Sequence, residues 1–189
     1  ILEIGAGSGF QSKILNSWNN QVEAIDISSS IYKKSIIYDV KTYDGKNIPY
    51  PENYFSIVFS SNVFEHILNI KNILNEISRV TKKGSKIILL MPSPSWRFWT
   101  SLTDIVRNWH SRPHGVHSKN IIEEFFFFSK ISWKNNLIHN DLKMEQILPN
   151  NIFYTGNYIF GKRLPIKARK YLSKIMGSSC NIYILRKIK

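Results

Sequence analysis

A short apolar stretch followed at once by three alternating glycines is the feature that most constrains this fold. Residues 1–4 are apolar apart from Glu3, and Gly5, Gly7 and Gly9 follow them. A turn this tight requires glycine, and a backbone without side chains can approach a ligand closely. The next residues are expected to form a helix, whose N-terminus presents unpaired N–H groups to that ligand. The pattern therefore predicts a strand, a loop for a nucleotide-like ligand and a helix.

Three further segments repeat the pattern of a buried strand followed by a polar turn. They are residues 21–27, 55–60 and 85–91. Apolar residues at helical spacing run through residues 67–80, and Lys82, Lys83 and Gly84 then predict the C-terminus of a helix. Because strands and helices alternate, the sequence predicts an α/β fold with a parallel sheet.

The second half of the chain is less regular. Residues 96–117 are aromatic and basic, and we interpret them as an inserted cap on the acceptor side. Ser118 is predicted to cap a helix that ends in the phenylalanine run 125–128, which is expected to pack in the core. Residues 143–148 and 181–186 are predicted to be the last strands.

The 189 residues are predicted to form a single domain, because a chain of this length buries most of its unfolded surface. Residues 1–91 form the expected cofactor-binding half, and residues 92–189 form the cap, the last strands and a basic tail. The sequence opens on Ile1 inside the first strand, so we expect its N-terminal part to be missing. The lone Cys180 excludes a disulfide framework and favours a reducing, cytoplasmic location.

The loop differs from a dinucleotide-binding fingerprint. That fingerprint is spaced G-x-G-x-x-G, whereas here the third glycine comes one residue early. Asp26 ends the second strand, where a carboxylate can accept both hydroxyls of a ribose or can simply cap a helix. Asp44 and Gly45 follow the third strand region. These groups are expected to converge at the carboxyl edge of the sheet.

Residues 2–9, Asp26, residues 44–55 and residues 60–67 together resemble the methyltransferase type 11 family of class I enzymes. The resemblance is confined to the first half of the chain. It implies a Rossmann-like, doubly wound and mostly parallel seven-stranded sheet with a reversed last strand. It also implies a transferase that binds S-adenosyl-L-methionine across the strand ends.

Carried over residue by residue, the resemblance implies a cofactor site on four successive loops. It assigns the methionine portion to Glu3, Gly5, Ala6, Gly7 and Gly9, the ribose to Asp26, the adenine to Ile27, Asp44 and Gly45, and the floor beneath the sulfonium to Asn62 and Val63.

Methyl transfer from a sulfonium is an in-line displacement, and a hydroxyl acceptor needs a base. Histidine suits this role near neutral pH. His114 and His117 flank Gly115 in the loop before the next helix and are the preferred catalytic residues, with His66 after the fourth strand as the third candidate. The alternative is structural, because such histidines also pack at helix starts or bond to backbone carbonyls.

Residues 62–66 also resemble the E-x-x-E-H segment of ubiquinone-pathway O-methyltransferases, in which the carboxylates imply a divalent metal. Asn62 stands in place of the first carboxylate. A hard cation requires several oxygen ligands, so we expect no bound metal.

The region from Trp96 to the basic tail resembles methyltransferases found with surface-polysaccharide genes. This resemblance implies O-methylation of a small molecule or of a sugar in a surface glycan. Methylation of a quinone-pathway precursor or of another small molecule is one alternative, and a non-catalytic binding module with the cofactor fold is another.

The chain carries a formal charge of +13, from 26 Lys and Arg against 13 Asp and Glu. Such a field favours anionic partners, although a compositional bias toward Lys, Asn and Ile produces the same excess. Residues 161–174 read as a basic amphipathic segment, either a solvated helix face or a peripheral contact with an anionic membrane surface. Nucleic acid is disfavoured, because no Asp-Pro-Pro-aromatic or Asn-Pro-Pro-aromatic turn follows the fourth strand and Cys180 is expected far from the site.

Overall fold

The computed structural model of the chain describes residues 1–30, 35–107, 110–154 and 164–189. The beginning of the predicted basic amphipathic segment, residues 161–163, lies outside the described residues. Within the described ranges, no helix combines the length and the apolar character that crossing a membrane requires.

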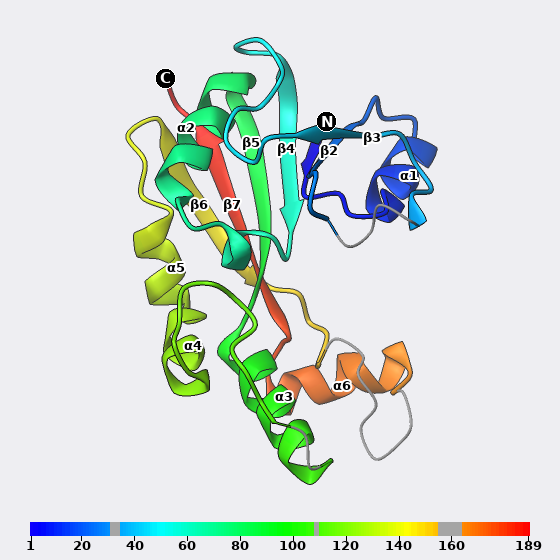
Figure 1. Ribbon diagram of the computed structural model, residues 1–189, viewed down its shortest axis with the longest axis vertical. Coiled ribbons are helices and arrows are strands. Elements are labelled where there is room, and N and C mark those ends of the chain that lie inside the picture. Colours follow the sequence, from blue (N-terminus) through cyan, green and yellow to red (C-terminus); the bar gives the residue numbers. More distant parts are fainter. Residues whose placement is uncertain (31–34, 108–109, 155–163) are drawn as a thin grey trace.

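Seven strands form one mixed sheet in the order β3-β2-β1-β4-β5-β7-β6 (Figure 1). Neighbouring strands from β3 to β5 in this order pair in parallel, whereas β7 runs antiparallel to both β5 and β6. The predicted seven-stranded sheet with a reversed last strand is therefore confirmed. The strands are β1 Leu2–Ile4, β2 Glu23–Ile27, β3 Val40–Tyr43, β4 Phe55–Ser61, β5 Thr81–Pro92, β6 Leu142–Pro149 and β7 Cys180–Lys187.

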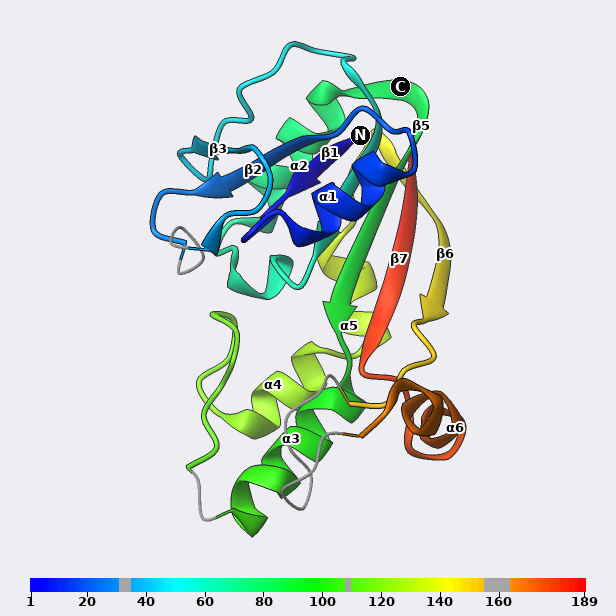
Figure 2. The same ribbon diagram turned by 90° about the vertical axis from the view of Figure 1, so that its right-hand side faces the viewer.

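Helices cover both faces of the sheet, with α1 and α2 on opposite sides (Figures 1 and 2). Three helices, α3, α4 and α6, gather beyond the carboxyl end of β5, and α5 precedes β6. The helical elements are α1 Phe10–Ser17, the 3-10 helix η2 Phe64–His66, α2 Ile70–Val80, α3 Pro94–Val106, α4 Ile121–Phe127, α5 Lys130–Asn136 and α6 Ile166–Met176. This arrangement leaves the carboxyl ends of β1, β2 and β4 facing the helices that follow β5.

Helix α2 shows why the predicted helical spacing produces a core. The Asn69 side chain caps its N-terminus by accepting a hydrogen bond from the backbone N–H of Asn72, at 3.1 Å. Ile73, Leu74 and Ile77 lie on one face and are at most 2% exposed. Full burial of such a side chain is worth about 1.5–3 kcal/mol, so this face fixes the helix against the sheet.

The predicted helix end at residues 82–84 is wrong. Helix α2 ends at Val80, and Thr81 already pairs with Phe55 as the first residue of β5. Gly84 lies inside the strand with φ of 80°, and the pairing register of β5 shifts beside it. The glycine therefore permits an irregularity within a strand, a role that in sequence resembles a helix C-cap.

The stretch from Trp96 was expected to be irregular, but it begins inside a regular helix. Ser93 caps helix α3, because its Oγ accepts a hydrogen bond from the backbone N–H of Trp96 at 3.2 Å, and Pro94 occupies the first turn. Proline suits that position because its fixed φ is helical and its missing N–H has no partner there in any helix.

Two expectations for the following helix also need correction. Asn120, not Ser118, caps helix α4 by accepting from the backbone N–H groups of Ile122 and Glu123. The phenylalanine run is not uniformly core, because Phe128 is fully buried while Phe126 is 65% exposed. Successive residues of a helix point in different directions, so four adjacent phenylalanines cannot share one buried face.

Candidate active site

The three predicted glycines form the turn between β1 and α1. Gly5, Gly7 and Gly9 have φ values of 72°, 58° and 79°, a region that other residues rarely adopt. The backbone N–H of Gly5 donates to the carbonyl of Ile25 on β2, at 2.8 Å. The loop is therefore fixed to the neighbouring strand, and Gly9 becomes the N-cap residue of α1.

Three of the predicted cofactor residues fix this loop and do not line the cleft described below. The Glu3 carboxylate is 1% exposed and accepts a hydrogen bond from the Ser12 hydroxyl of α1. Its burial raises the pKa of Glu3 above the ordinary value. Ala6 is 8% exposed, and a Cβ on Gly9 would lie 2.5 Å from the Cβ of Tyr38. Their predicted contacts with the methionine portion stay predictions.

Asp26 lies at the end of β2, as the sequence predicted. Its Oδ2 accepts from the backbone N–H of Gly7 at 3.0 Å, and its Oδ1 accepts from the N–H of Ile27 at 2.8 Å. A carboxylate offers about four lone-pair sites, so both oxygens keep capacity for further donors. Asp26 thus links the glycine loop to the strand end and remains available to a pair of hydroxyls.

Asp44 and Gly45 form the turn after β3. The Asp44 carboxylate accepts hydrogen bonds from the backbone N–H groups of Lys46 and Asn47, both at 2.7 Å. These two hydrogen bonds hold the pKa of Asp44 below its usual value, and the bond from Asn47 has the larger effect. The Asp44 side chain therefore shapes the turn, and both Asp44 and Gly45 line the cavity beside β3; their predicted contact with adenine stays a prediction.

Asn62 and Val63 follow β4, where the sequence placed the floor of the site. Asn62 has φ of 54°, a left-handed conformation that asparagine tolerates better than most residues. Val63 packs directly under the glycine loop, and a Cβ on Gly5 would lie 2.3 Å from Val63 Cγ2. The absence of a side chain at Gly5 is what allows this approach.

Cys180 corrects one expectation, because it lies in the same cleft and not far from it. Its thiol is 3.6 Å from Asn62 Oδ1 at the start of β7. Burial raises the pKa of Cys180 to about 12. A nucleophilic cysteine requires a lowered pKa, so the position of this thiol does not revive cytosine-C5 chemistry.

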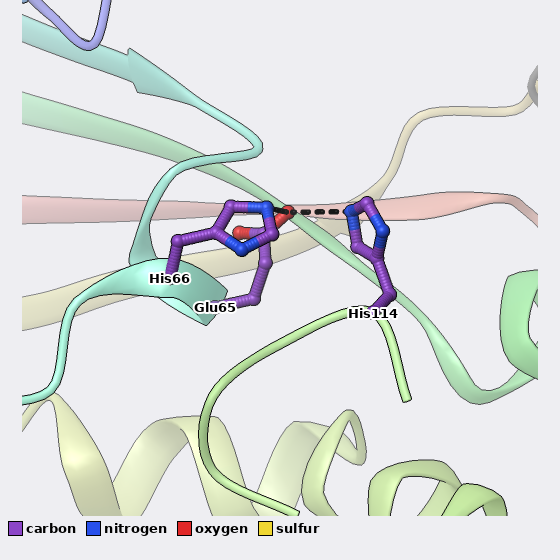
Figure 3. Close-up of side chains that lie close together, drawn as sticks. All are labelled: Glu65, His66 and His114. Carbon is purple, nitrogen blue, oxygen red and sulfur yellow. Dashed lines mark ion pairs between the residues drawn. The ribbon is translucent and has the colours of Figure 1, made fainter. Parts of the chain in front are cut away.

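Two of the predicted histidines meet at one buried carboxylate (Figure 3). Glu65 is fully buried in η2, and the Nε2 atoms of His66 and His114 each lie 4.0 Å from its Oε1. The two imidazole rings stand edge to face with centroids 4.8 Å apart. Burial lowers the pKa of both histidines, whose side chains are 42% and 44% exposed.

His117, the other predicted base, faces a different environment. Its ring stacks on Phe127 with centroids 4.6 Å apart, and its Nε2 lies 3.4 Å from the carbonyl oxygen of Phe64. It is absent from the lining of the cleft. The structure therefore brings His66 and His114 together and places His117 behind them.

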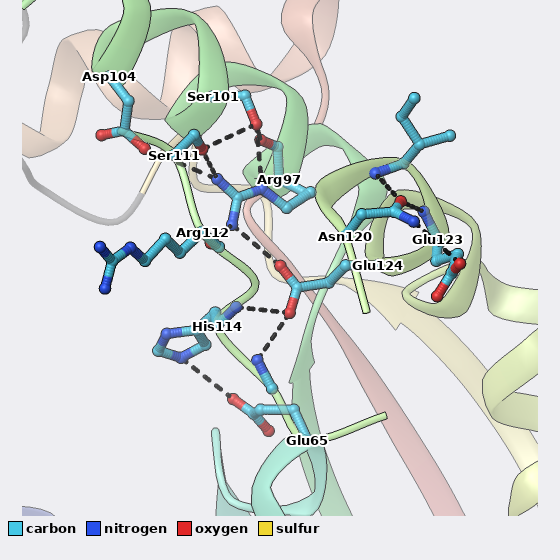
Figure 4. Close-up of polar contacts among 12 residues, drawn as sticks. Glu65, Arg97, Ser101, Asp104, Ser111, Arg112, His114, Asn120, Glu123 and Glu124 are labelled. Carbon is cyan, nitrogen blue, oxygen red and sulfur yellow. Dashed lines mark hydrogen bonds and ion pairs between the residues drawn. The ribbon is translucent and has the colours of Figure 1, made fainter. Parts of the chain in front are cut away.

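A buried ion pair positions the loop that carries His114 (Figure 4). Glu124 Oε1 accepts from the backbone N–H groups of His114 and Gly115, at 2.7 and 2.6 Å. Glu124 Oε2 accepts from Arg97 Nη1 at 2.9 Å, and Arg97 also donates to the carbonyl of Arg112. Helices α3 and α4 thus determine where His114 lies.

The sites at the strand ends share one continuous cleft. Its main cavity has a volume of about 610 Å³, within the range of small-molecule sites, and a second cavity beside β3 shares part of its wall. Eight predicted cofactor residues and two predicted bases line the two cavities. They are Gly5, Gly7, Asp26, Ile27, Asp44, Gly45, Asn62, Val63, His66 and His114.

Comparison with known proteins places the first half of the chain in a family. Residues 2–89 match the model of the methyltransferase domain of type 11. The ubiquinone/menaquinone biosynthesis C-methyltransferase of Cupriavidus taiwanensis is 29% identical over 51% of this chain and 44% of its own length. The malonyl-[acyl-carrier protein] O-methyltransferase of Hamiltonella defensa is 25% identical over 76% of this chain and 54% of its own. The chain spans about half the length of these relatives.

The solved structures agree on the fold. A methyltransferase from Mesorhizobium loti superposes with a TM-score of 0.63 at 12% identity, covering 98% of this chain and 89% of its own. Geranyl diphosphate C-methyltransferase from Streptomyces coelicolor, in complex with S-adenosyl-L-homocysteine, superposes with a TM-score of 0.60 at 12% identity, covering 99% and 71%. Residues 2–89 belong to the methyltransferase type 11 family. The family is one of S-adenosylmethionine-dependent methyltransferases, as the sequence predicted.

The residues of this methyltransferase domain fit its cofactor. Asp26 would supply a carboxylate acceptor for ribose hydroxyls, Gly7 offers backbone without a side chain, and Ile27 and Val63 are apolar lining residues. Gly5 and Asn62 line the same cavity as His66 and His114.

Substituting Gly5 by alanine is expected to weaken both folding and cofactor binding. The positive φ alone costs about 1–2 kcal/mol, and the new Cβ would also force Val63 away. Gly84→Ala is the matched control, because it has the same backbone strain and no atom within 4 Å. Urea denaturation measures the loss of stability, which should be larger for the Gly5 variant. Calorimetry with S-adenosyl-L-homocysteine should show lost affinity for the Gly5 variant only. Equal effects in both variants would contradict the packing argument.

Three features of the candidate site were not predicted from the sequence. The sequence indicated the Glu65 carboxylate only as part of the E-x-x-E-H resemblance and of helix-start packing, and it did not indicate the Arg97 to Glu124 pair. Trp96, whose ring lies 5.0 Å from that of His114 and which lines the cleft, was assigned only to an irregular cap. The one available signal was the E-H dipeptide, which places an acid beside a histidine directly after β4.

Proposed function

We propose that the protein is an enzyme that transfers a methyl group from S-adenosylmethionine to a hydroxyl oxygen of a small acceptor. One observation carries the proposal. A single cleft joins the strand-end residues suited to the donor, among them Gly7 and Asp26, to a wall formed by His66, Trp96 and His114. A donor and an acceptor bound there would meet in one chamber.

The protein's part in such a reaction is mainly positioning. Bound cofactor supplies an electrophilic methyl group on a sulfonium. Asp26 and the glycine loop hold the donor, while Trp96 provides a flat apolar surface against which an acceptor ring can pack. Holding two reactants in line accounts for much of the rate gain in a displacement of this kind.

The two histidines supply the proton acceptor that a hydroxyl requires. Because burial lowers the pKa of both His66 and His114, the imidazoles are neutral at pH 7. A neutral imidazole can accept the proton that the hydroxyl loses. His117 lies behind the cleft and is the weakest of the three candidates.

The acceptor is proposed to be a sugar hydroxyl of a surface glycan that carries phosphate. The charge of +13 supports an anionic substrate. Helix α6 adds Lys167, Lys170 and Lys174, which also suit a peripheral contact with an anionic membrane surface. The second candidate is a quinone-pathway precursor, which the printed function of the Cupriavidus taiwanensis relative favours.

An acceptor panel tests the proposal. The protein is incubated with labelled S-adenosylmethionine and one acceptor at a time: a nucleotide sugar, a lipid-linked glycan, a demethylated quinol or a malonyl carrier protein. Transfer to a sugar acceptor that falls at least about 100-fold in His114→Ala is expected, since general base catalysis contributes roughly 100- to 10,000-fold. Transfer to the quinol alone would replace the glycan by the second candidate. Binding of cofactor without transfer to any acceptor would overturn the enzyme proposal.

A further inference from the structure

The Glu65 carboxylate is a buried polar group without a hydrogen-bond partner. Its side chain is 0% exposed, and neither Oε1 nor Oε2 has a partner among the described residues. Leaving a carboxylate unpaired in the interior is costly, and burial raises the pKa of Glu65 to about 8. Buried acids in proteins are normally paired with a cation or coordinate a metal.

Two imidazole nitrogens face this carboxylate from different elements (Figure 3). His66 follows Glu65 in η2, whereas His114 comes from the loop between α3 and α4. One ligand atom from each of the three residues lies within 4.8 Å of the other two. The four-coordinate site of a zinc ion, with bonds of 2.0–2.2 Å, places its ligands about 3.4 Å apart. The Glu65 to imidazole distances of 4.0 Å need only a small closing movement.

We infer that Glu65, His66 and His114 bind one divalent transition-metal ion, with zinc as the best fit. Two imidazoles, which are borderline ligands, together with one carboxylate form a set that suits Zn²⁺ and related ions better than the hard cations Mg²⁺ and Ca²⁺, which prefer all-oxygen sites. The half-exposed histidine side chains can rotate toward the ion, while Glu65 is held in place by the core. Because His66 and His114 line the cleft, the remaining coordination position is reached from the cleft. With the ion bound, the two coordinating imidazole nitrogens no longer act as the proposed proton acceptors, and the ion would instead supply Lewis acidity toward the acceptor hydroxyl.

His114, the third ligand, is held in position by its own loop without any ion. The backbone N–H of Val116 donates to the carbonyl of Glu65 at 2.9 Å, and a Cβ on Gly115 would lie 2.6 Å from that same oxygen. Glu124 holds the preceding backbone through the N–H groups of His114 and Gly115. A preorganised ligand loses less freedom on binding, so this bracing favours metal affinity.

This site has a different set of ligands from the metal site that the E-x-x-E-H resemblance would imply. The sequence predicted no metal because Asn62 stands in place of a carboxylate. Asn62 is not part of the cluster, since its Oδ1 faces the Cys180 thiol. The missing ligand is supplied by His114, far along the chain, and changes the set from oxygen-rich to nitrogen-rich.

Metal binding can be measured without any methyl transfer. Chelator-treated protein is titrated with ZnCl₂ by calorimetry and by competition with a chromophoric chelator, in the absence of S-adenosylmethionine. One ion per chain is expected in the wild type. Loss of an outer-shell partner alone costs about 10- to 100-fold in metal affinity, so removing a ligand in Glu65→Gln or His114→Ala should cost at least about 100-fold.

Two variants serve as controls. His139→Ala removes an exposed histidine that bonds to Asn75, and Cys180→Ser replaces the only thiol, so both should keep wild-type affinity. Circular dichroism establishes that each variant is folded. Replacing zinc by Co²⁺ should give the visible spectrum of a low-coordinate site with nitrogen ligands. Absence of stoichiometric binding, or equal affinity in wild type, Glu65→Gln and His114→Ala, would overturn the inference whatever the outcome of the acceptor panel.

Discussion

Replacing Glu124 by alanine should lower the free energy of unfolding by about 3–5 kcal/mol, the range measured when one partner of a buried ion pair is removed. The Arg97 and Glu124 side chains are only 2% and 1% exposed, so the variant would leave the buried guanidinium with Asp104, at 3.8 Å, as its remaining carboxylate partner. Two backbone N–H groups, those of His114 and Gly115, would lose their acceptor as well. Urea denaturation monitored by tryptophan fluorescence measures the change.

Two control variants separate the effect of the charge from the effect of its burial. Glu124→Gln keeps an oxygen acceptor for the loop but removes the charge, so its loss should be intermediate. Glu145→Gln breaks an ion pair with Arg186 at the surface, where both groups are solvated, and should leave the denaturation midpoint almost unchanged. A loss in Glu124→Ala no greater than that of Glu145→Gln would show that the buried pair does not hold the two helices together.

The same network relates stability to the chemistry of the cleft. Helix α3 carries Arg97, helix α4 carries Glu124, and the loop held between them carries His114 (Figure 4). Moving that loop would separate His114 from Glu65 without touching either side chain. Glu124 is therefore a positioning residue for the acceptor side, whereas the glycine loop and Asp26 belong to a different part of the sheet edge.

Elements formed by contiguous residues could be predicted from the sequence. The strands β4, β6 and β7 lie within one or two residues of their predicted bounds, because a buried strand reads as a short apolar run between turn residues. The reversal of β7 was expected only through the family resemblance. Nothing local distinguishes an antiparallel last strand from a parallel one.

Other features depended on packing that a sequence does not display. Helix α3 was not recognised because its outer face carries exposed apolar residues, with Phe98 at 52% and Ile105 at 65%, which blur the amphipathic period. Ser118 and Asn120 are both good N-cap residues, and only the path of the chain selects Asn120. The ligand cluster around Glu65 joins residues that are distant in sequence, so the E-H dipeptide alone could not reveal His114.

On the donor side of the cleft, Asp26→Ala is expected to weaken S-adenosylmethionine binding at least about 100-fold. A carboxylate that accepts from both ribose hydroxyls makes two charge-assisted hydrogen bonds, each worth about 1.5–3 kcal/mol. Each 1.4 kcal/mol is tenfold in affinity. The substitution also removes the acceptor for the Gly7 N–H, which loosens the loop that faces the donor.

Calorimetric titration with S-adenosylmethionine and S-adenosyl-L-homocysteine measures this effect. Asp26→Asn separates the two contributions, because an amide oxygen can still accept from Gly7 while the paired negative acceptors for the ribose are gone. Its affinity should fall nearly as far as that of Asp26→Ala, with less loss of stability. Asp141→Ala removes the same charge beside a different cavity and should bind as the wild type does. Unchanged affinity in both Asp26 variants would move the ribose elsewhere and leave Asp26 as a brace of the glycine loop.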